Sequence, residues 1–347
     1  MSGTSLDGID AALIVSDGTT VSETGIARTT PYDESFRARL RATLGKSDAP
    51  ADVERDLTEA HGRAVRALLA AANLTPADID VVGFHGHTVL HRPREGLTRQ
   101  IGDGALLARM IGIDVVNDFR TADVKSGGEG APFVPLYHAA LAAPLTPPLA
   151  ILNLGGVANL TWIGEQGRLM AFDTGPGNAL IDDWCASRAG MPFDESGRLA
   201  RAGRIDEAVL ARMLDHPFFD RPAPKSLDRL EFGLDHVAEL SPADGAATLA
   251  AFTAASVARG TALFPAPARR FLVTGGGRHN ATLMEMLAQR LAAPVAPVES
   301  VGWDGDALEA QAFAFLAVRS LRGLPLSLPE TTGCARPTSG GILHRRP

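Results

Sequence analysis

Hydrophobic positions along the chain follow two different periods. Short apolar runs rich in β-branched residues predict buried strands. Such runs cover residues 9–15, 79–84, 113–116, 149–154 and 271–274. Between them, longer segments repeat apolar positions every three to four residues, as amphipathic helices do, with examples from Val53, Leu249 and Leu308 onward. Strands that alternate with helices favour the α/β class.

Length and irregular stretches predict two domains. A domain typically has about 100–200 residues, and this chain has 347. We expect an N-terminal domain over residues 1–128 and a C-terminal domain over residues 129–347, with the last segment free to pack back on the first domain. Residues 142–149 hold three prolines and mark a break before a new strand.

Composition and charge exclude several classes of protein. The net charge of -7 argues against nucleic acid as the main partner, and no apolar run approaches the ~20 residues of a membrane span. The two cysteines, Cys185 and Cys334, fit a reducing compartment. The first residues lack the basic and apolar regions of a signal peptide. We therefore expect a cytoplasmic protein that binds neither nucleic acid nor membranes.

Glycine-rich turns flank the predicted strands at several places. Glycine lets backbone N–H groups approach an anion closely, and hydroxyl side chains add donors. With their polar neighbours, the turns comprise Gly3, Thr4, Ser5, Leu6, Asp7 and Gly8; Asn153, Gly155 and Gly156; Asp173, Gly175 and Gly177; and Gly275, Gly276, Gly277 and Asn280. Taken singly, each turn is also explained by a plain β-turn, a hairpin or a strand-to-helix link.

The order of these turns favours one superfamily. A phosphate-type turn at the start, two near the middle and one in the C-terminal half match the actin-like ATPases and sugar kinases, in which two related domains clasp ATP. Neither a P-loop motif nor a dinucleotide-binding glycine motif occurs. We predict a two-domain actin-like ATPase fold with ATP in the interdomain cleft. Asp7 and Asp173 are the carboxylates expected to hold Mg²⁺ through water.

Longer strings narrow the resemblance further. In chain order they are MSGTSLDGIDAAL, GFHGHTVLH, QIGDGALLA, VVNDFRTADVKSGGEGAPFVP, LNLGGVANL, FDTGPGNALIDDW, VTGGGRHN and DALEAQAFAFLA. Together they resemble the anhydro-N-acetylmuramic acid kinases over nearly the whole chain. The resemblance implies a cell-wall recycling enzyme that converts the 1,6-anhydro sugar, ATP and water into N-acetylmuramic acid 6-phosphate and ADP, and it implies a homodimer. Family members usually carry a few residues before the first string, so we expect a shortened first strand here or a start further upstream.

Candidate site residues follow from the motifs and from the resemblance. Asp182 lies on the first turn of a helix after the Gly-Pro-Gly turn, where a carboxylate can take a proton from water, and it aligns with the family's catalytic base. Arg120 is expected to bind the lactyl carboxylate of the sugar through two hydrogen bonds. The other residues expected to bind the sugar are Ser2, His85, His87, Thr88, Asn178 and Glu309.

Simpler interpretations stay open for these residues. An alternative role for Asp182 is pairing with the helix dipole, although Asp183 suits that role better, and Arg120 has Asp118 and Asp123 nearby as surface partners. A different sugar kinase of the superfamily would share the turns but not the FHGHT and DFR strings. A non-catalytic ATP-switch protein would need no base beside its substrate.

Overall fold

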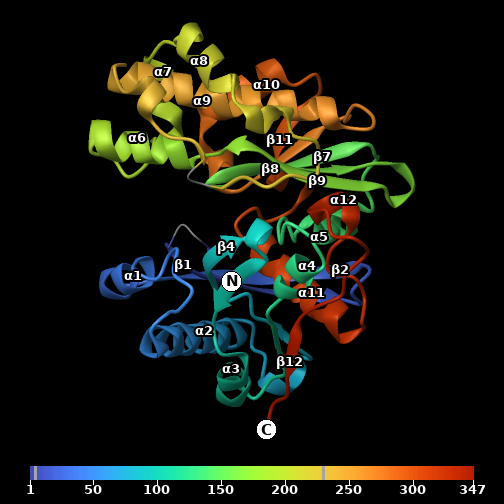
Figure 1. Cartoon of the computed structure of the whole chain (residues 1–347). Coiled ribbons are helices and arrows are strands. Elements are labelled where there is room, and N and C mark those ends of the chain that lie inside the picture. The colour runs from blue at the N-terminus through green and yellow to red at the C-terminus, as the bar shows by residue number, and fades with distance from the viewer. Residues whose placement is uncertain (4–5, 229–230) are drawn as a thin grey trace. The chain divides into compact units, whose positions relative to one another are not determined.

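The computed structural model describes residues 1–3, 6–228 and 231–347, and its contacts divide the chain into two compact units (Figure 1). Unit 1 holds Met1–Pro144 and Ala307–Pro347, and unit 2 holds Leu145–Asp306. The change from unit 1 to unit 2 therefore falls in the proline-rich stretch, whereas the sequence predicted a boundary after residue 128. The α/β class is confirmed.

The helix α5 (Pro135–Ala142) explains why the first unit extends beyond residue 128. Tyr137 on α5 donates a hydrogen bond of 2.8 Å to Gln311 on α11 (Leu308–Leu321), and its ring lies 5.6 Å from that of Phe315. Both helices therefore share one core. These contacts join positions more than 170 residues apart in the chain, so no local pattern reveals them.

Unit 2 is built on a mixed sheet with the strand order β11-β10-β7-β8-β9. Its strands are β7 (Leu149–Leu154), β8 (Val157–Ile163), β9 (Leu169–Pro176), β10 (Phe271–Thr274) and β11 (Val295–Pro297). The strands β7 and β10 pair in parallel, and β8 runs antiparallel to both of its neighbours. The sequence predicted β7 and β10 at these same residues, because nearly every position in both strands is buried.

Helices of unit 2 gather beside this sheet (Figure 1). They are α6 (Ala179–Ala189), α7 (Arg198–Ala202), α8 (Glu207–Leu214), α9 (Pro242–Gly260) and α10 (Ala281–Arg290). The long helix α9 is central, since it packs against α6, α7, α8, α10 and β9. The Ser241 hydroxyl caps its first turn by accepting from the Asp244 N–H. The indole N–H of Trp184 on α6 donates to the Pro242 carbonyl at 2.8 Å, which ties α6 to the start of α9.

Unit 1 contains smaller sheets and surrounding helices. Its first elements are β1 (Gly8–Ser16), β2 (Val21–Pro31), α1 (Glu34–Arg41), α2 (Ala51–Ala71), β3 (Val82–Gly83), β4 (His87–Arg92), β5 (Leu97–Ile101), α3 (Gly104–Ile111), β6 (Val115–Asn117) and α4 (Thr121–Lys125). After unit 2 the chain adds α11, α12 (Pro329–Thr332) and β12 (Ile342–His344). The strands pair as β1-β2, β12-β6-β3 and β4-β5. The C-terminal strand β12 thus completes a sheet that the N-terminal half began.

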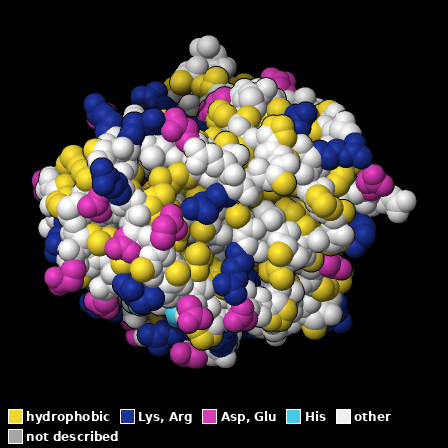
Figure 2. Space-filling model, turned by 90° about the horizontal axis from the view of Figure 1, so that it is seen from above, with side chains coloured by type: hydrophobic (Ala, Val, Ile, Leu, Met, Phe, Trp, Pro, Cys, Tyr) yellow, Lys and Arg dark blue, Asp and Glu magenta, His cyan; other side chains and the backbone are white. Residues whose placement is uncertain are grey.

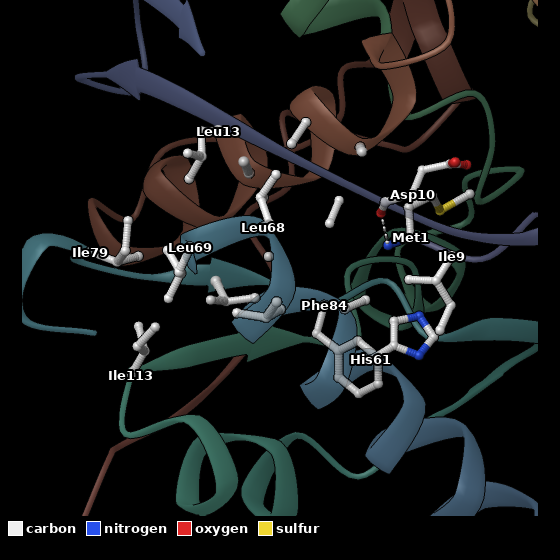
Figure 3. A pocket seen from close by; sticks show the side chains of 18 of the residues that line it. Met1, Ile9, Asp10, Leu13, His61, Leu68, Leu69, Ile79, Phe84 and Ile113 are labelled. Carbon is white, nitrogen blue, oxygen red and sulfur yellow. Dashed lines mark hydrogen bonds between the residues drawn. The ribbon is translucent and has the colours of Figure 1, made fainter. Parts of the chain in front are cut away.

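An apolar cavity of about 80 Å³ lies in unit 1 between β1, α2, β3 and α11 (Figure 3). Its walls are mainly aliphatic, and Leu13, Leu68 and Ile79 are among them. At one side the Met1 amine donates a hydrogen bond of 2.9 Å to the Asp10 carbonyl oxygen. Because sugars and phosphates need several polar partners, this apolar lining does not suit them.

A buried histidine beside this cavity makes unit 1 sensitive to acid. The Nδ1–H group of His61 on α2 bonds the Leu57 carbonyl at 2.8 Å, and the ring lies 4.9 Å from that of Phe84. Burial holds the pKa of His61 well below its usual 6.5. The folded chain therefore keeps this ring neutral at pH values at which the unfolded chain protonates it, and protonation draws the equilibrium toward the unfolded state.

We expect His61→Leu to weaken the pH dependence of stability. Lowering the pH from 7.5 to 6.0 costs about 0.8 kcal/mol for one histidine that titrates near 6.5 only when unfolded. Urea unfolding at both pH values checks this, and the loss of stability on acidification should be smaller in the variant by about that amount. An equal loss in variant and wild type would contradict a neutral His61.

The surface carries mixed charges on the face that Figure 2 shows. Lys and Arg side chains alternate there with Asp and Glu and with hydrophobic groups, without an extended patch of one sign. Within residues 1–3, 6–228 and 231–347, no helix is both long enough and apolar enough to cross a membrane.

Candidate functional site

Two glycine turns of unit 2 meet at one end of its sheet. One turn, Gly155 and Gly156, joins β7 to β8, and the other ends β9 at Gly177. The Gly177 N–H donates to the Gly156 carbonyl at 2.9 Å, and the Asn178 N–H donates to the Gly155 carbonyl at 2.8 Å. A side chain at Gly177 would come within 2.3 Å of the Gly155 oxygen, so the close approach of the two turns requires glycine.

The triple-glycine turn joins them because β10 runs parallel to β7. The carboxyl ends of parallel strands meet at the same edge of a sheet, and Thr274 at the end of β10 pairs with Asn153. Gly275 has a φ of +78°, and a side chain there would approach the Asn153 amide oxygen to 2.5 Å. Gly156 and Gly276 are exposed. The turns after β7 and β10 therefore each expose one glycine to solvent, as an anion site needs, whereas Gly175 and Gly177 at the end of β9 are buried.

Sequence reasoning missed the side chain that holds the triple-glycine turn. Arg278 is 8% exposed. It donates to the Gly275 carbonyl at 3.1 Å, to Glu299 at 2.8 Å and forms an ion pair of 2.9 Å with Asp306. Arg278 stands in the string VTGGGRHN, but its two carboxylate partners come more than 20 residues later, so only the fold identifies them.

Several predicted nucleotide-binding side chains of unit 2 have structural partners. The Asn280 side chain accepts from the Leu283 N–H at 2.9 Å and caps α10. The Asn178 amide donates to the Leu154 carbonyl at 2.9 Å, which fixes the turn after β9 against the end of β7. These contacts shape the turns, and a nucleotide would meet mainly their backbone groups.

Asp182 lies beside the meeting point of the two hairpin turns. Its backbone N–H bonds the Asn178 carbonyl at 2.8 Å, which places it on the first turn of α6 directly after the Gly-Pro-Gly sequence. Its side chain is partly exposed, and that of Asp183 is exposed. On the buried face of α6, the pKa of the Cys185 thiol rises to about 11, mainly through burial and further through Asp194 and Asp182. Cys185 therefore stays protonated at neutral pH and is no nucleophile.

In unit 1, the first turn of the chain is anchored by a buried hydroxyl pair. Ser2 is 1% exposed, and its Oγ lies 3.0 Å from His87 Nδ1. The Tyr32 hydroxyl donates to the same Oγ at 2.7 Å. Leu6 is buried with a φ of 59°, so only its backbone is available to a ligand. The predicted phosphate contacts Thr4 and Ser5 lie outside the described residues.

Arg120 is held by neutral partners in unit 1. Its Nε–H donates to His85 Nε2 at 3.1 Å, and its Nη1 donates to the Gly130 carbonyl at 2.7 Å. Its guanidinium lies over the rings of Phe133 and Phe313, at 5.3 and 5.7 Å from their centroids. Burial, followed by Arg120 itself, keeps the pKa of His85 well below 6.5. His85 therefore stays neutral, and it can accept the Arg120 hydrogen bond.

The remaining predicted sugar contacts of unit 1 lie on β4 and α11. The Thr88 hydroxyl accepts from the Gln100 amide at 3.3 Å. Glu309 on the first turn of α11 has an exposed side chain. Burial of its carboxyl group raises the pKa of Glu309, and the charge of Arg120 opposes that rise.

The two predicted magnesium carboxylates differ in accessibility. Asp7 is exposed, and one of its oxygens accepts from the Gly8 N–H at 2.9 Å. Asp173 is 8% exposed, and one of its oxygens accepts from the Leu227 N–H at 2.8 Å. Mg²⁺ is usually held by one or two carboxylates plus phosphates and waters, which Asp7 fits better than Asp173. Leaving aside the four positions that are not described, no cluster of three or more His, Cys, Asp or Glu side chains could hold a metal ion.

Comparison with known proteins identifies the family whose sequences this chain matches. A family model described as anhydro-N-acetylmuramic acid kinase matches residues 1–345. A protein of that name from Rhodospirillum rubrum is 61% identical over 98% of this chain and 92% of its own length. Another, from Paramagnetospirillum magneticum, is 57% identical over 99% of this chain and 98% of its own length. Among solved structures, a ROK family glucokinase from Streptomyces griseus covers 90% of this chain and 96% of its own, with 16% identity and a TM-score of 0.40, too distant a likeness to carry an argument.

Proposed function

The chain belongs to the anhydro-N-acetylmuramic acid kinase family, and from this premise we propose that it hydrolytically opens 1,6-anhydro-N-acetylmuramic acid and phosphorylates O6. The products are N-acetylmuramic acid 6-phosphate and ADP. Membership of this family fits the actin-like ATPase and sugar-kinase fold that the glycine turns predict. Such a reaction serves the recycling of cell-wall fragments.

Each unit supplies a different part of the chemistry. In unit 2, the backbone of Gly155, Gly156, Gly177 and the triple-glycine turn binds the phosphates of ATP. In unit 1, Arg120 binds the lactyl carboxylate, and Glu309 accepts hydrogen bonds from sugar hydroxyls. Ser2, His85, His87 and Thr88 are the further residues of unit 1 that we assign to polar contacts with the sugar; of these, Ser2, His85 and His87 are buried in this structure.

Asp182 acts as the general base. It takes a proton from water as the water oxygen attacks the anomeric carbon. The bond from that carbon to the bridging oxygen breaks, and the freed O6 takes the γ-phosphoryl group of ATP while ADP leaves. The course resembles inverting glycoside hydrolysis, with the phosphoryl group in place of the proton of a general acid. Mg²⁺, which the exposed Asp7 suits, neutralises phosphate charge when it is bound.

The placement of Asp182 carries this proposal. A partly exposed carboxylate stands one helical turn after two glycine turns that bond each other and that include the exposed Gly156. A protein that only switches shape with nucleotide has no need of a base there. Within the family, this position therefore favours a catalyst over a nucleotide-dependent switch.

Mass spectrometry of the reaction products tests the proposal. The purified chain is incubated with ATP, Mg²⁺ and the anhydro sugar, and ATP alone serves as the control. We expect a product that gains one water and one phosphoryl group per sugar. A phosphorylated sugar that retains its anhydro bridge would instead support a different sugar kinase. ADP release without any sugar phosphate would support an ATP-switch protein.

Location and assembly remain predictions of the same proposal. The substrate is a small sugar, and we expect the protein to meet it in the cytoplasm as a homodimer. Sedimentation of the purified chain measures its mass directly, and a monomer at enzyme-assay concentrations would contradict the homodimer.

A further inference from the structure

We propose that Asp123 is a positioning residue for Arg120, and that hydroxyl groups of the C-terminal segment, residues 327–335, hold Asp123 in place. The inference rests on the proposed role of Arg120 in binding the sugar carboxylate. It adds a residue whose side chain contacts neither substrate. All the groups involved belong to unit 1.

The Asp123 carboxylate is the centre of a buried network. Asp123 lies on α4 and is 1% exposed. One oxygen accepts from the Gly130 N–H at 2.7 Å. The other accepts from the hydroxyl groups of Thr332, at 2.6 Å, and Ser327. A buried carboxyl group is tolerated only when hydrogen-bond donors replace its lost water, and these three donors do so for Asp123.

The loop over residues 126–130 is shaped around this carboxylate. A side chain at Gly128 would lie 2.3 Å from a carboxylate oxygen of Asp123, so the loop can pass this close only as glycine. Gly130 has a φ of +66°, and a side chain there would come within 2.7 Å of Val124. The conformation of the loop is therefore specified by Asp123 and by two positions that exclude side chains.

The C-terminal segment fixes the loop from its other side. The Glu129 N–H donates to the Thr332 carbonyl at 2.7 Å, and the Ala335 N–H donates to the Ser126 carbonyl at 3.0 Å. Thr332 thus holds the loop twice, through its backbone and through Asp123. Residues about 200 positions apart in the chain build one rigid support.

The loop over residues 126–130 in turn binds Arg120. The Gly130 carbonyl in this loop accepts a hydrogen bond from Nη1 of Arg120, and His85 Nε2 accepts one from Nε. Within the described residues, Nη2 donates no hydrogen bond to the protein, so that edge of the guanidinium is available to a carboxylate. Both hydrogen-bond acceptors of Arg120 are neutral, so the Gly130 carbonyl fixes the side chain without forming an ion pair with it.

We expect Asp123→Asn to raise the KM for the anhydro sugar about tenfold. The amide can still accept from Gly130, but its NH₂ group cannot accept from Ser327 and Thr332, so the loop shifts and Arg120 loses a fixed partner. The KM for ATP and kcat should stay within about twofold. A residue that merely stabilises the fold would change all three together.

A double-mutant cycle with Arg120→Ala separates positioning from general damage. Once Arg120 is absent, Asp123→Asn should raise the KM for the sugar by less than about twofold, because the two residues act through one contact. A further tenfold rise in the Arg120→Ala background would overturn the proposal. Wild type that turns over no anhydro sugar would instead overturn the proposed function, so the two failures are distinguishable.

Variants of the C-terminal segment provide a second test of the proposal if the Asp123→Asn protein does not fold. Thr332→Val combined with Ser327→Ala removes both hydroxyl donors, and we expect about a fivefold rise in the KM for the sugar. Glu330→Gln is the matched control, since Glu330 lies on the same α12 but is exposed. Equal KM values in the double variant, the control and the wild type would overturn the support by the C-terminal segment.

Discussion

Asp182→Asn should lower kcat at least about 10²-fold while leaving the Kd for ATP nearly unchanged. The amide has almost the same shape as the carboxylate, but it cannot take a proton from water, and general base catalysis typically contributes a factor of this size. ATP binding depends on the backbone of the glycine turns. The Asp182 side chain lies one helical turn beyond them, so its loss should affect the chemical step and spare nucleotide binding.

The neighbouring Asp183 supplies the matched control. It sits on the same helix but is exposed, and Asp183→Asn should retain kcat within about twofold. Single-turnover kinetics and ATP titration on both variants make the comparison. A folded Asp182→Asn enzyme with turnover near that of the wild type would remove Asp182 from the role of base and leave it as a residue that interacts with the helix dipole.

Arg120→Ala should raise the KM for the anhydro sugar about 10- to 150-fold and leave the KM for ATP nearly unchanged. A hydrogen bond to a charged group contributes about 1.5–3 kcal/mol, and every 1.4 kcal/mol is a factor of ten in binding. The effect should concentrate on the sugar because Arg120 is held by His85 and Gly130 in unit 1, whereas the glycine turns beside Asp182 belong to unit 2.

A sugar without its lactyl group provides the control for this variant. Wild type should bind the lactyl-free anhydro sugar about as weakly as Arg120→Ala binds the complete one, and the variant should hardly distinguish the two sugars. If removal of the lactyl group weakens wild type and variant by the same factor, Arg120 contacts some other part of the substrate.

Sequence alone predicts the parts of the fold that depend on local burial. The strands β7 and β10 appear at the expected residues, because parallel strands covered on both faces are continuous apolar runs. The expected strand over residues 79–84 is longer than β3, which covers only Val82–Gly83. It pairs with β6, which itself begins only at Val115, so few positions have a partner strand.

The candidate site divides in the same way between local and distant contacts. Glycine turns and the position of Asp182 follow from motifs within a few residues, so they can be read from the chain. The residues that hold these turns in place cannot be identified from the sequence in this way. Arg278 meets Glu299 and Asp306 through the return of the chain after β11, and Asp123 meets Thr332, which lies 209 residues later in the chain. Hydrogen bonds between distant polar residues leave no periodic signal, and only the folded chain reveals them.

Isotope labelling of the bridging oxygen tests the central claim most directly. The anhydro sugar is prepared with ¹⁸O in its 1,6-bridge, and the product formed with ATP is examined by ³¹P NMR, in which ¹⁸O bonded to phosphorus shifts the phosphate signal. The proposed reaction predicts that the label lies in the phosphate ester, because the bridging oxygen becomes O6 and takes the phosphoryl group. An unshifted phosphate signal would contradict it, because the phosphoryl group would then have been transferred to a different oxygen.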